Sequence, residues 1–455
     1  MAFFLMTFCS QSSPLYPLNT WDDANCLLTV GRAMRSGAVL YKDIYEQKGP
    51  TLYAIHTLAA CISDTDFFGV YLFEIAACFL TLLAAYRICA RKGHMPAVPV
   101  AFFCAAAYSS FSFSRGDSAE EFCLPCLMFL MMLADDPETV TRETFSAWRM
   151  FCMGLLSGII GTIKFTILGV SIGICLYATY CLMPRHPAEL AKAAGCFLAG
   201  MLIPVAAWLC YFGMHDALGD FFTAYIYNNI FLYAGDHGTL RDSLSMILGN
   251  WVWLLLLIPA AAGAVTERNM AVLFALLVQG TVLILGGRMW FYTLFVLTPF
   301  AVFGLRTLFP LAEKYIRVRW VYSVLGTAAL ILAALLTPNA SMRFIPIENT
   351  AQGKLCAKIE KGASFLQYSH LDDGMYLLLD TLPQEKFFVT LNVDYPEMHD
   401  ELNRYLEEGI PQYVLITWRM LPERFDRYRQ IDYANSYDVF TKTTKDFFLY
   451  RRIDL

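Results

Sequence analysis

The sequence contains little charge and no excess of basic residues. Only 16% of its 455 residues are Asp, Glu, Lys or Arg, and the formal net charge is -5. Because a soluble domain carries about 25% charged residues, this composition argues against an ordinary soluble enzyme. A nucleic-acid-binding chain needs a basic patch or stripe, so we expect no nucleic-acid partner.

The sequence also lacks the residue spacing of a metal site. Its 14 cysteines lie mostly in apolar runs, where a free cysteine behaves as a small hydrophobic residue. Cys123 and Cys126 form a CxxC pair, but no second pair follows to complete a zinc site. The histidines show no ligand spacing either, so the residue pattern predicts no metal site.

Apolar residues are abundant instead: they make up 57% of the chain, and the mean hydropathy is +0.47. A membrane-spanning helix needs about 20 mainly apolar residues, and shorter helices suit a bundle around a water-filled cavity. Ten segments fit this pattern: Phe67–Cys89, Pro96–Phe113, Phe122–Leu133, Met150–Ile163, Phe165–Met183, Ala193–Phe212, Met246–Val265, Met270–Leu285, Trp290–Leu305 and Val321–Leu336. The chain is therefore predicted to be a mainly α, multi-pass membrane protein in the lipid bilayer of the cell membrane.

Lysines and arginines in the short loops predict the orientation, because they are enriched on the cytoplasmic side of a membrane. They concentrate in alternate loops, at residues 91–92, 142–149, 185–192, 268 and 306–319. This pattern places the segment Ser10–Asp66, the loop Gly213–Ser245 and the tail after Leu336 on the outer side. Residues 1–9 are apolar but too short to span. Either they form a partial helix that its neighbours complete, or the true start codon lies upstream.

The chain changes character after residue 337. Charge rises, and short strand-like runs appear at Phe387–Val393, Tyr413–Trp418, Tyr437–Thr441 and Phe447–Arg452. A helix-like stretch, Glu397–Glu408, lies between the first two runs and ends at a glycine. We therefore predict a transmembrane domain of residues 1–337, with a first external loop of residues 10–66. A small extracytoplasmic α/β domain of residues 338–455 follows it.

Charged side chains collect at the predicted outer face. An ionisable residue in or beside a membrane helix is costly and is usually functional. The candidates are Asp22, Asp23, Asp43, Lys48, Arg115, Glu120, Glu121, Lys164 and Arg288. Because acidic and basic groups gather on one side of the membrane, the sequence predicts a single outward-facing cavity.

Each candidate also has a structural interpretation. Asp22 and Asp23 suit the start of the amphipathic helix that runs to about Arg35. Glu120 and Glu121 suit the positive end of the helix that they begin. Lys164 is able to snorkel toward water, and Arg288 is a possible topology charge. Glu74, inside an apolar segment, is expected to have a structural partner rather than a catalytic role.

The first external loop resembles that of the family 39-like glycosyltransferases of GT-C fold, which include protein mannosyltransferases and lipid A aminoarabinose transferases. The matching residues are Asp23, Gly31, Gly37, Tyr41-Lys42-Asp43 and Gln47-Lys48-Gly49-Pro50. Glu120-Glu121 followed by Leu124-Pro125 resembles the second acidic site of this family. Lys164 after its glycine-containing turn, and Arg288 with Tyr292 and Pro299, are similar to later family segments.

The resemblance covers most of the membrane part, although the first loop is its only specific portion. The chain departs from the family in its short first helix. It also has Asp-Asp where many relatives have Asp-Glu, which leaves the choice between Asp22 and Asp23 open. The spacing favours Asp23.

The resemblance implies a GT-C-type transmembrane bundle and an enzyme that moves a sugar from a polyprenyl phosphate to an acceptor hydroxyl on the outer side of the membrane. Asp23 is then the expected base, with Asp22 or Asp43 in support. Fixed cations must stabilise the phosphate that leaves. The candidates for this role are Lys48, Arg115, Lys164 and Arg288.

Glu120 or Glu121 is expected to orient the acceptor hydroxyl or one of these cations, and Tyr292 is a candidate for stacking on a sugar. The acceptor is an envelope glycan, a lipid or a protein. No cofactor is required by the residue pattern, although a divalent metal is possible because some relatives use one. Two other functions stay open: a transporter or flippase of a lipid-linked sugar, and a non-catalytic protein of polysaccharide assembly.

Overall fold

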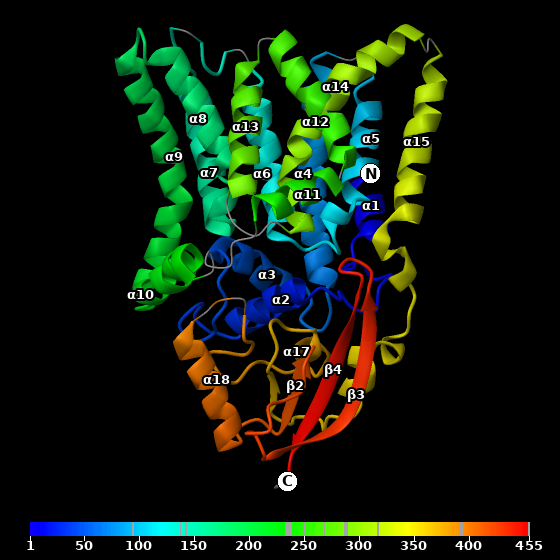
Figure 1. Ribbon diagram of the computed structural model, residues 1–455. Helices are drawn as coiled ribbons and strands as arrows, with labels where there is room; N and C mark the ends of the chain where they lie inside the picture. Colours follow the sequence, from blue (N-terminus) through cyan, green and yellow to red (C-terminus); the bar gives the residue numbers. More distant parts are fainter. Residues whose placement is uncertain are drawn as a thin grey trace.

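The structure is a computed structural model. It describes residues 1–92, 95–136, 138–141, 143–232, 239–249, 251–267, 269–285, 290–315, 318–391, 393 and 395–453. Figure 1 shows three layers: a bundle of long helices, a middle layer of short helices, and a C-terminal domain that contains a sheet. Both the middle layer and the sheet lie at the same end of the bundle, which we call the rim.

The helices of the bundle overlap the predicted apolar segments. They are α4 (Phe68–Ala90), α5 (Ala97–Tyr108), α6 (Ala119–Ala134), α7 (Ala147–Ile163), α8 (Gly169–Leu182), α9 (Pro187–Met214), α12 (Trp251–Thr266), α13 (Met270–Leu285), α14 (Thr298–Tyr315) and α15 (Arg319–Leu336). Within the described ranges, four helical segments are long and apolar enough to cross a membrane: Phe68–Ala90, Pro187–Met214, Phe291–Tyr315 and Arg319–Leu336.

Small residues allow the bundle helices to approach closely, as is common in membrane proteins. A Cβ atom added at Gly154 of α7 would lie 1.9 Å from the carbonyl oxygen of Phe197 in α9. A Cβ atom added at Gly200 of α9 would lie 2.1 Å from the carbonyl oxygen of Phe151. The α7–α9 pair is therefore packed backbone to backbone.

The predicted span Met246–Val265 crosses residue 250, which lies outside the described residues. Its described parts belong to α11 (Leu240–Gly249) and α12. The first turn of α11 carries Arg241 and Asp242.

The middle layer consists of α2 (Asp22–Arg35) and α3 (Pro50–Ile62). These two helices touch at Gly31, where a Cβ atom would lie 2.6 Å from the backbone carbon of His56. The first helix of the chain, α1 (Ala2–Cys9), packs against α4 and α15. As predicted, the amphipathic helix begins at Asp22 and ends at Arg35.

The C-terminal domain has a four-stranded sheet in the order β1-β2-β4-β3. Strand β1 (Phe365–Gln367) pairs in parallel with β2 (Tyr413–Thr417), and the other pairings, β2 with β4 (Thr443–Arg452) and β4 with β3 (Tyr428–Asp438), are antiparallel. Helix α18 (Pro396–Glu408) ends at Gly409, whose φ of +71° suits glycine. The sheet and this helix confirm the predicted small α/β fold.

Two of the predicted strands are wrong. The run at 387–393 has no strand in its described residues, although Phe387, Phe388 and Val389 are buried. The run Tyr437–Thr441 contains the end of β3 and the turn that follows it. Strand β3 itself alternates between exposed and partly buried residues. Because many of its side chains are polar, a search for apolar runs does not detect it.

Candidate active site at the rim of the helix bundle

Asp23 and Lys48 form an ion pair at the rim. Asp23 lies in the first turn of α2, and its Oδ1 lies 2.6 Å from Nζ of Lys48. Lys48 Nζ also donates to Oε1 of Glu46 at 3.1 Å, and Glu46 is fully buried. Burial alone would lower the pKa of Lys48, but the carboxylates of Asp23 and Glu46 outweigh it and raise that pKa well above its ordinary value. Lys48 is therefore charged.

The Lys48-Gly49-Pro50 turn is pressed against the end of α7. The backbone N–H of Gly49 donates to the carbonyl oxygen of Ile163 at 3.0 Å. A Cβ atom at Gly49 would lie 2.2 Å from the carbonyl oxygen of Thr162, so only glycine allows this approach. Pro50 then begins α3, a position that suits proline. This contact brings the segments that carry Lys48 and Lys164 together.

Lys164 joins Glu120 and Tyr292. It lies in an extended conformation between α7 and the 3-10 turn η2 (Phe165–Ile167), and its Nζ lies 2.6 Å from Oε1 of Glu120. The same ammonium lies 5.7 Å from the ring centre of Tyr292, which is within the range of a cation–π contact. The ring of Tyr292 contacts that of Trp21 at 5.1 Å, and Trp21 directly precedes α2. The structure thus brings Asp23, Lys48, Glu120, Lys164 and Tyr292 to one place.

Asp22 and Arg115 point toward the C-terminal domain instead. Oδ2 of Asp22 lies 3.4 Å from Nζ of Lys445 in β4. Arg115 forms an ion pair with Asp438 at the end of β3. Burial alone would raise the pKa of Asp22, but Lys445 and Arg115 outweigh it and hold that pKa below its usual value. Arg115, a predicted phosphate ligand, is therefore already paired with a carboxylate.

Glu121 belongs to a buried network rather than to the Lys164 pair. Its Oε2 accepts from the backbone N–H of Asp117, which also donates to Glu74. Asp117 Oδ1 lies 2.7 Å from Nε2 of His56, and Ser10 donates to Glu74. These carboxylates and the imidazole are at most 1% exposed. Glu74 thus has structural partners, as expected, and Glu120 rather than Glu121 contacts a predicted cation.

The remaining predicted residues lie apart from this cluster. Asp43 is exposed and accepts from the backbone N–H of Val39 in a turn beyond the C-terminal end of α2. The structure therefore gives Asp43 a turn contact and does not bring it to Asp23. Arg288 lies outside the described residues, so its predicted role stays a prediction.

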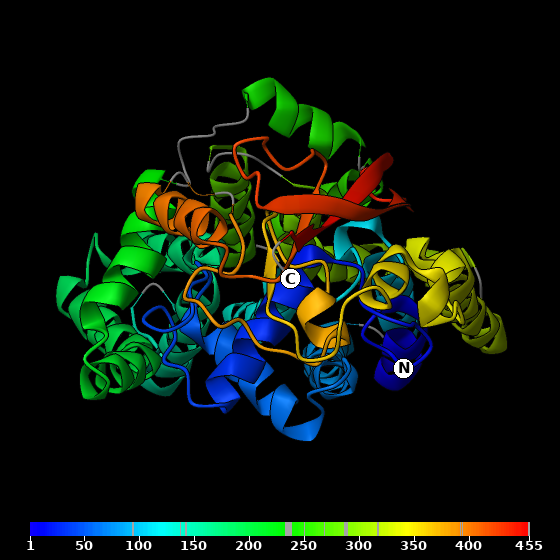
Figure 2. The same cartoon turned by 90° about the horizontal axis from the view of Figure 1, so that it is seen from below.

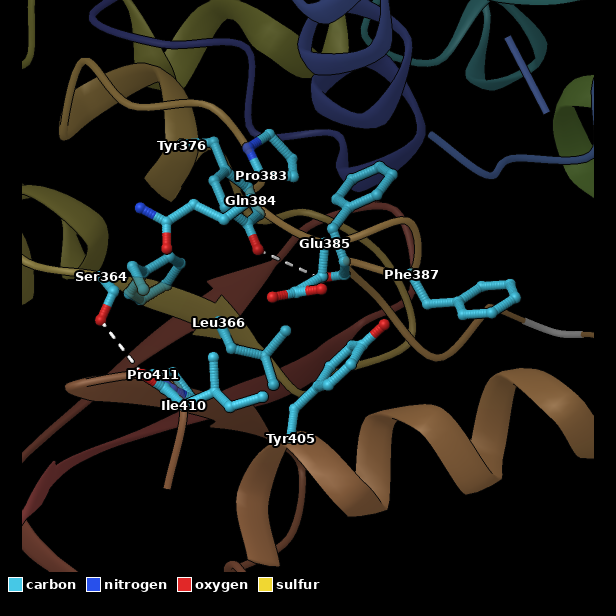
Figure 3. Close-up of a pocket in the computed structure, with 12 residues that line it drawn as sticks. Ser364, Leu366, Tyr376, Pro383, Gln384, Glu385, Phe387, Tyr405, Ile410 and Pro411 are labelled. Atoms are coloured by element: carbon cyan, nitrogen blue, oxygen red, sulfur yellow. Dashed lines mark hydrogen bonds between the residues drawn. The ribbon is translucent and has the colours of Figure 1, made fainter. Parts of the chain in front are cut away.

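Two cavities lie away from the cluster. One, in the C-terminal domain, has a volume of about 20 Å³ and is lined by Leu366, Tyr376, Glu385 and Tyr405, among others (Figure 3). That volume holds about one water molecule, so it does not fit a sugar. The other, of about 350 Å³, lies at the end of the bundle opposite the rim, beside Arg306.

Metal dependence remains a prediction. Across the described ranges, no group of three or more His, Cys, Asp or Glu side chains is arranged to hold a metal ion.

Sequence reasoning missed Glu46 and the contacts from the C-terminal domain. Glu46 lies two residues before Lys48, beside the motif that carries the family resemblance. A carboxylate so close to a predicted cation was a signal that sequence reasoning could have used. Lys445 and Asp438 lie more than 300 residues from their partners along the chain. A single sequence contains no local signal for such contacts.

The C-terminal domain lies against the α2–α3 layer, and the view from below in Figure 2 shows this domain in front of it.

The helix bundle, the α2–α3 layer at its rim and the appended α/β domain together form a GT-C-type fold, as the resemblance predicted. The chain is similar to ArnT from Cupriavidus metallidurans bound to undecaprenyl phosphate, with a TM-score of 0.60 and 11% identity over 98% of this chain and 96% of that one. It is also similar to ArnT from Cupriavidus metallidurans in the apo state, with a TM-score of 0.61 and 10% identity over 98% and 95% of the two chains. No protein-family model and no curated protein matches the sequence.

Proposed function

We propose that this protein is a membrane glycosyltransferase that moves a sugar from a polyprenyl-phosphate donor to an acceptor hydroxyl on the outer face of the cell membrane. The observation that carries the proposal is the cluster at the rim, where Asp23 contacts Lys48 at 2.6 Å and Lys164 contacts Glu120 at 2.6 Å. The undecaprenyl phosphate bound to the similar ArnT structure supports the donor class.

Asp23 is the proposed general base. The acceptor oxygen attacks the anomeric carbon of the donor sugar, and the bond from that carbon to the phosphate oxygen breaks. The electron pair of this bond goes to the polyprenyl phosphate, and the hydroxyl proton goes to the Asp23 carboxylate. Asp23 is partly exposed, with 16% of its side chain accessible, so an acceptor is able to reach it.

Lys48 and Lys164 are the proposed phosphate ligands, because the leaving phosphate gains charge and needs fixed cations. An ammonium has three N–H donors, and within the described residues the Lys48 contacts to Asp23 and Glu46 use two of them. The third is able to bind a phosphate oxygen. A phosphate bound to Lys48 then competes with Asp23 for the same ammonium.

Glu120 and Tyr292 are proposed to position Lys164 and the sugar. Glu120 orients the ammonium of Lys164, and Tyr292 presents a ring beside the same ammonium. Arg288 stays a proposed third phosphate ligand. The orientation argued from loop charge places this cluster and the C-terminal domain outside the cytoplasm, where the acceptor is an envelope glycan, a lipid or a protein.

The direct test is turnover by the purified full-length protein in lipid nanodiscs. A panel of polyprenyl-phosphate sugars is supplied with an envelope extract, and the released polyprenyl phosphate is measured by mass spectrometry. We expect wild-type protein to release it from at least one donor and Asp23→Asn to be at least about 100-fold slower. Equal turnover by the two proteins would contradict the assignment of Asp23. An arm with EDTA tests whether a divalent metal takes part.

A further inference from the structure

The hairpin formed by β3 and β4 reaches from the C-terminal domain to the bundle (Figure 1). Its turn contains Phe440, which is 9% exposed. The ring of Phe440 stacks on that of Phe291, with 5.8 Å between the ring centres. It contacts the ring of Phe111 edge-on, with 5.7 Å between the ring centres. Because Phe291 directly precedes Tyr292, the tip of the hairpin is seated beside the candidate active site.

The hairpin also supplies charges to two predicted site residues. Asp438 pairs with Arg115, whose guanidinium lies 4.4 Å from the ring centre of Phe440. Lys445 lies 3.4 Å from Asp22 and also pairs with Asp373 in its own domain. The hairpin therefore supplies counter-charges to Asp22 and Arg115, two predicted site residues that lie outside the Asp23–Lys48 and Glu120–Lys164 pairs.

The loop that presents Arg115 is held in an unusual conformation. Ser114 and Asp117, neither of them glycine, have φ angles of +58° and +61°. Such conformations persist only where the surroundings enforce them. Here Glu74 of the bundle helix α4 and His56 of the middle-layer helix α3 bind Asp117. The bundle and the middle layer therefore together determine the position of Arg115, and with it the docking of the hairpin.

We propose that the β3–β4 hairpin is a working part of the active site and that Lys445 is its positioning residue. This inference rests on the proposed function. Asp22 and Asp23 are adjacent carboxylates in one helical turn, and both compete for nearby cations. Lys445 holds Asp22, so Asp23 alone pairs with Lys48. Without Lys445, Asp22 would compete for Lys48 or repel the charge on Asp23.

The proposal predicts a change in pH dependence. The charged groups that face Asp22 within the described residues are Lys445 from β4, Arg115 from the loop before α6, its neighbour Asp23, and Asp373, which also pairs with Lys445. Loss of Lys445 leaves Arg115 as the cation beside Asp22. The added negative charge beside the base favours the neutral form of that base. The acidic limb of the rate profile, which reports protonation of the base, then moves to higher pH.

The experiment compares the full-length wild type with Lys445→Met, Lys445→Arg and the control Lys442→Met, which changes an exposed lysine in the turn of the same hairpin. Release of polyprenyl phosphate is measured from pH 4 to pH 9, and hydrogen exchange reports whether the hairpin stays docked. We expect Lys445→Met to lower kcat at least tenfold and to move the acidic limb upward. Lys445→Arg and Lys442→Met should keep the wild-type profile.

A wild-type profile for Lys445→Met would overturn the inference. So would a loss of activity with an unmoved acidic limb and an undocked hairpin, because that result indicates a structural role alone. A wild-type protein without any turnover would instead contradict the proposed function, and this inference with it.

Discussion

Lys48 binds two carboxylates in the structure, and these compete with the donor phosphate that is proposed to bind the same ammonium. Replacing it by methionine leaves Asp23 and the buried Glu46 facing each other without a cation. We expect Lys48→Met to lower kcat/KM for the donor at least about 100-fold, measured as polyprenyl phosphate release. Lys48→Arg should recover part of the loss, because guanidinium suits phosphate oxygens.

The matched control is Lys42→Met, which removes an exposed lysine from the same external loop. An equal loss in both variants would show that the effect comes from the loop as a whole rather than from the ammonium of Lys48.

Glu120 and Glu121 provide a second residue-scale test, since the sequence left the choice between them open. Glu120→Gln removes the charge that holds Lys164, so donor turnover should fall by about tenfold or more. Glu121→Gln should have a smaller effect, because an amide oxygen still accepts from the N–H of Asp117. The same turnover assay measures both, and a larger loss for Glu121→Gln would refute the assignment of Glu120.

The buried carboxyl group of Asp372 should make the stability of the protein depend on pH. Its carboxylate accepts from the hydroxyl of Thr29 in α2 at 2.7 Å, and burial raises its pKa from 3.8 to about 6. Because this pKa is higher in the folded protein than in the unfolded chain, protonation of Asp372 stabilises the folded state. This stabilisation is complete below about pH 4 and is lost as the pH rises to about 6. It amounts to about 3 kcal/mol.

The measurement is Tm in detergent between pH 4 and pH 7, for the wild type and for Asp372→Asn, which has no charge to bury. The Tm of the variant relative to that of the wild type should increase over this range. A constant difference would contradict the role given to Asp372.

Among single residues, the sequence proposed Asp23, Lys48, Glu120, Lys164 and Tyr292 for the site; in the structure Asp23 pairs with Lys48, and Lys164 lies beside Glu120 and Tyr292. It also proposed Asp43 and Arg115, which the structure places in other contacts. Residue type and side of the membrane are readable from a single sequence. The partner of a side chain is set by packing between distant segments, and no local pattern contains it.

The Lys48-Gly49-Pro50 turn is the element that joins the two halves of the site. Gly49→Ala places a Cβ atom 2.2 Å from a backbone carbonyl of α7, and backbone is unable to yield as a flexible side chain does. We expect a loss of stability of about 1–3 kcal/mol and a fall in turnover per folded molecule, because Lys48 shifts. Thermal unfolding and the donor assay measure the two effects.

Gly195→Ala is the control, since nothing lies within 4 Å of a Cβ atom built at that residue of α9. It should leave turnover unchanged and slightly increase helix stability. Turnover of Gly49→Ala equal to that of Gly195→Ala would refute the close-contact argument.

At the scale of elements, long apolar runs predicted the bundle well, whereas the sheet was predicted only in part. Helices α4 and α13 match their predicted segments to within one residue at each end, because a membrane helix is defined by composition over many residues. Strand β1 has three residues and β3 is mostly polar. The partners of β1 in β2 lie 48 residues away along the chain, and the sequence contains no local sign of this pairing.

At the scale of the whole molecule, a network of ion pairs closes the end of the bundle opposite the rim. Arg306 in α14 contacts Asp135 and Glu267, each at 2.7 Å, and only 4% of its side chain is exposed. Arg91 and Lys92 bind the same two carboxylates. Removing one member of a buried network leaves uncompensated charge, so Arg306→Met should cost about 3–5 kcal/mol.

Arg404→Met is the control, because Arg404 forms exposed pairs on α18 that contribute about 0–1 kcal/mol. Thermal unfolding measures both variants. Turnover per folded molecule should stay at the wild-type level for Arg306→Met, since the network lies far from the rim. A specific loss of turnover at full stability would contradict this separation of the two ends.

Composition and apolar runs predicted the overall plan of the molecule: a helical bundle followed by a small α/β domain. No pattern in the sequence indicated that the C-terminal domain touches the candidate site. That contact depends on Asp438, Phe440 and Lys445 at the far end of the chain, and it appears only when the chain is folded.

The fate of an isotope-labelled sugar distinguishes sugar transfer from transport of the intact donor. Wild-type protein in nanodiscs is given a polyprenyl-phosphate donor with a labelled sugar and an envelope acceptor. Mass spectrometry then counts the labelled acceptor and the free polyprenyl phosphate. We expect the labelled acceptor and the free polyprenyl phosphate to appear in equal amounts, and we expect Asp23→Asn to abolish both. Intact donor moved across the membrane, with no labelled acceptor formed, would contradict this expectation.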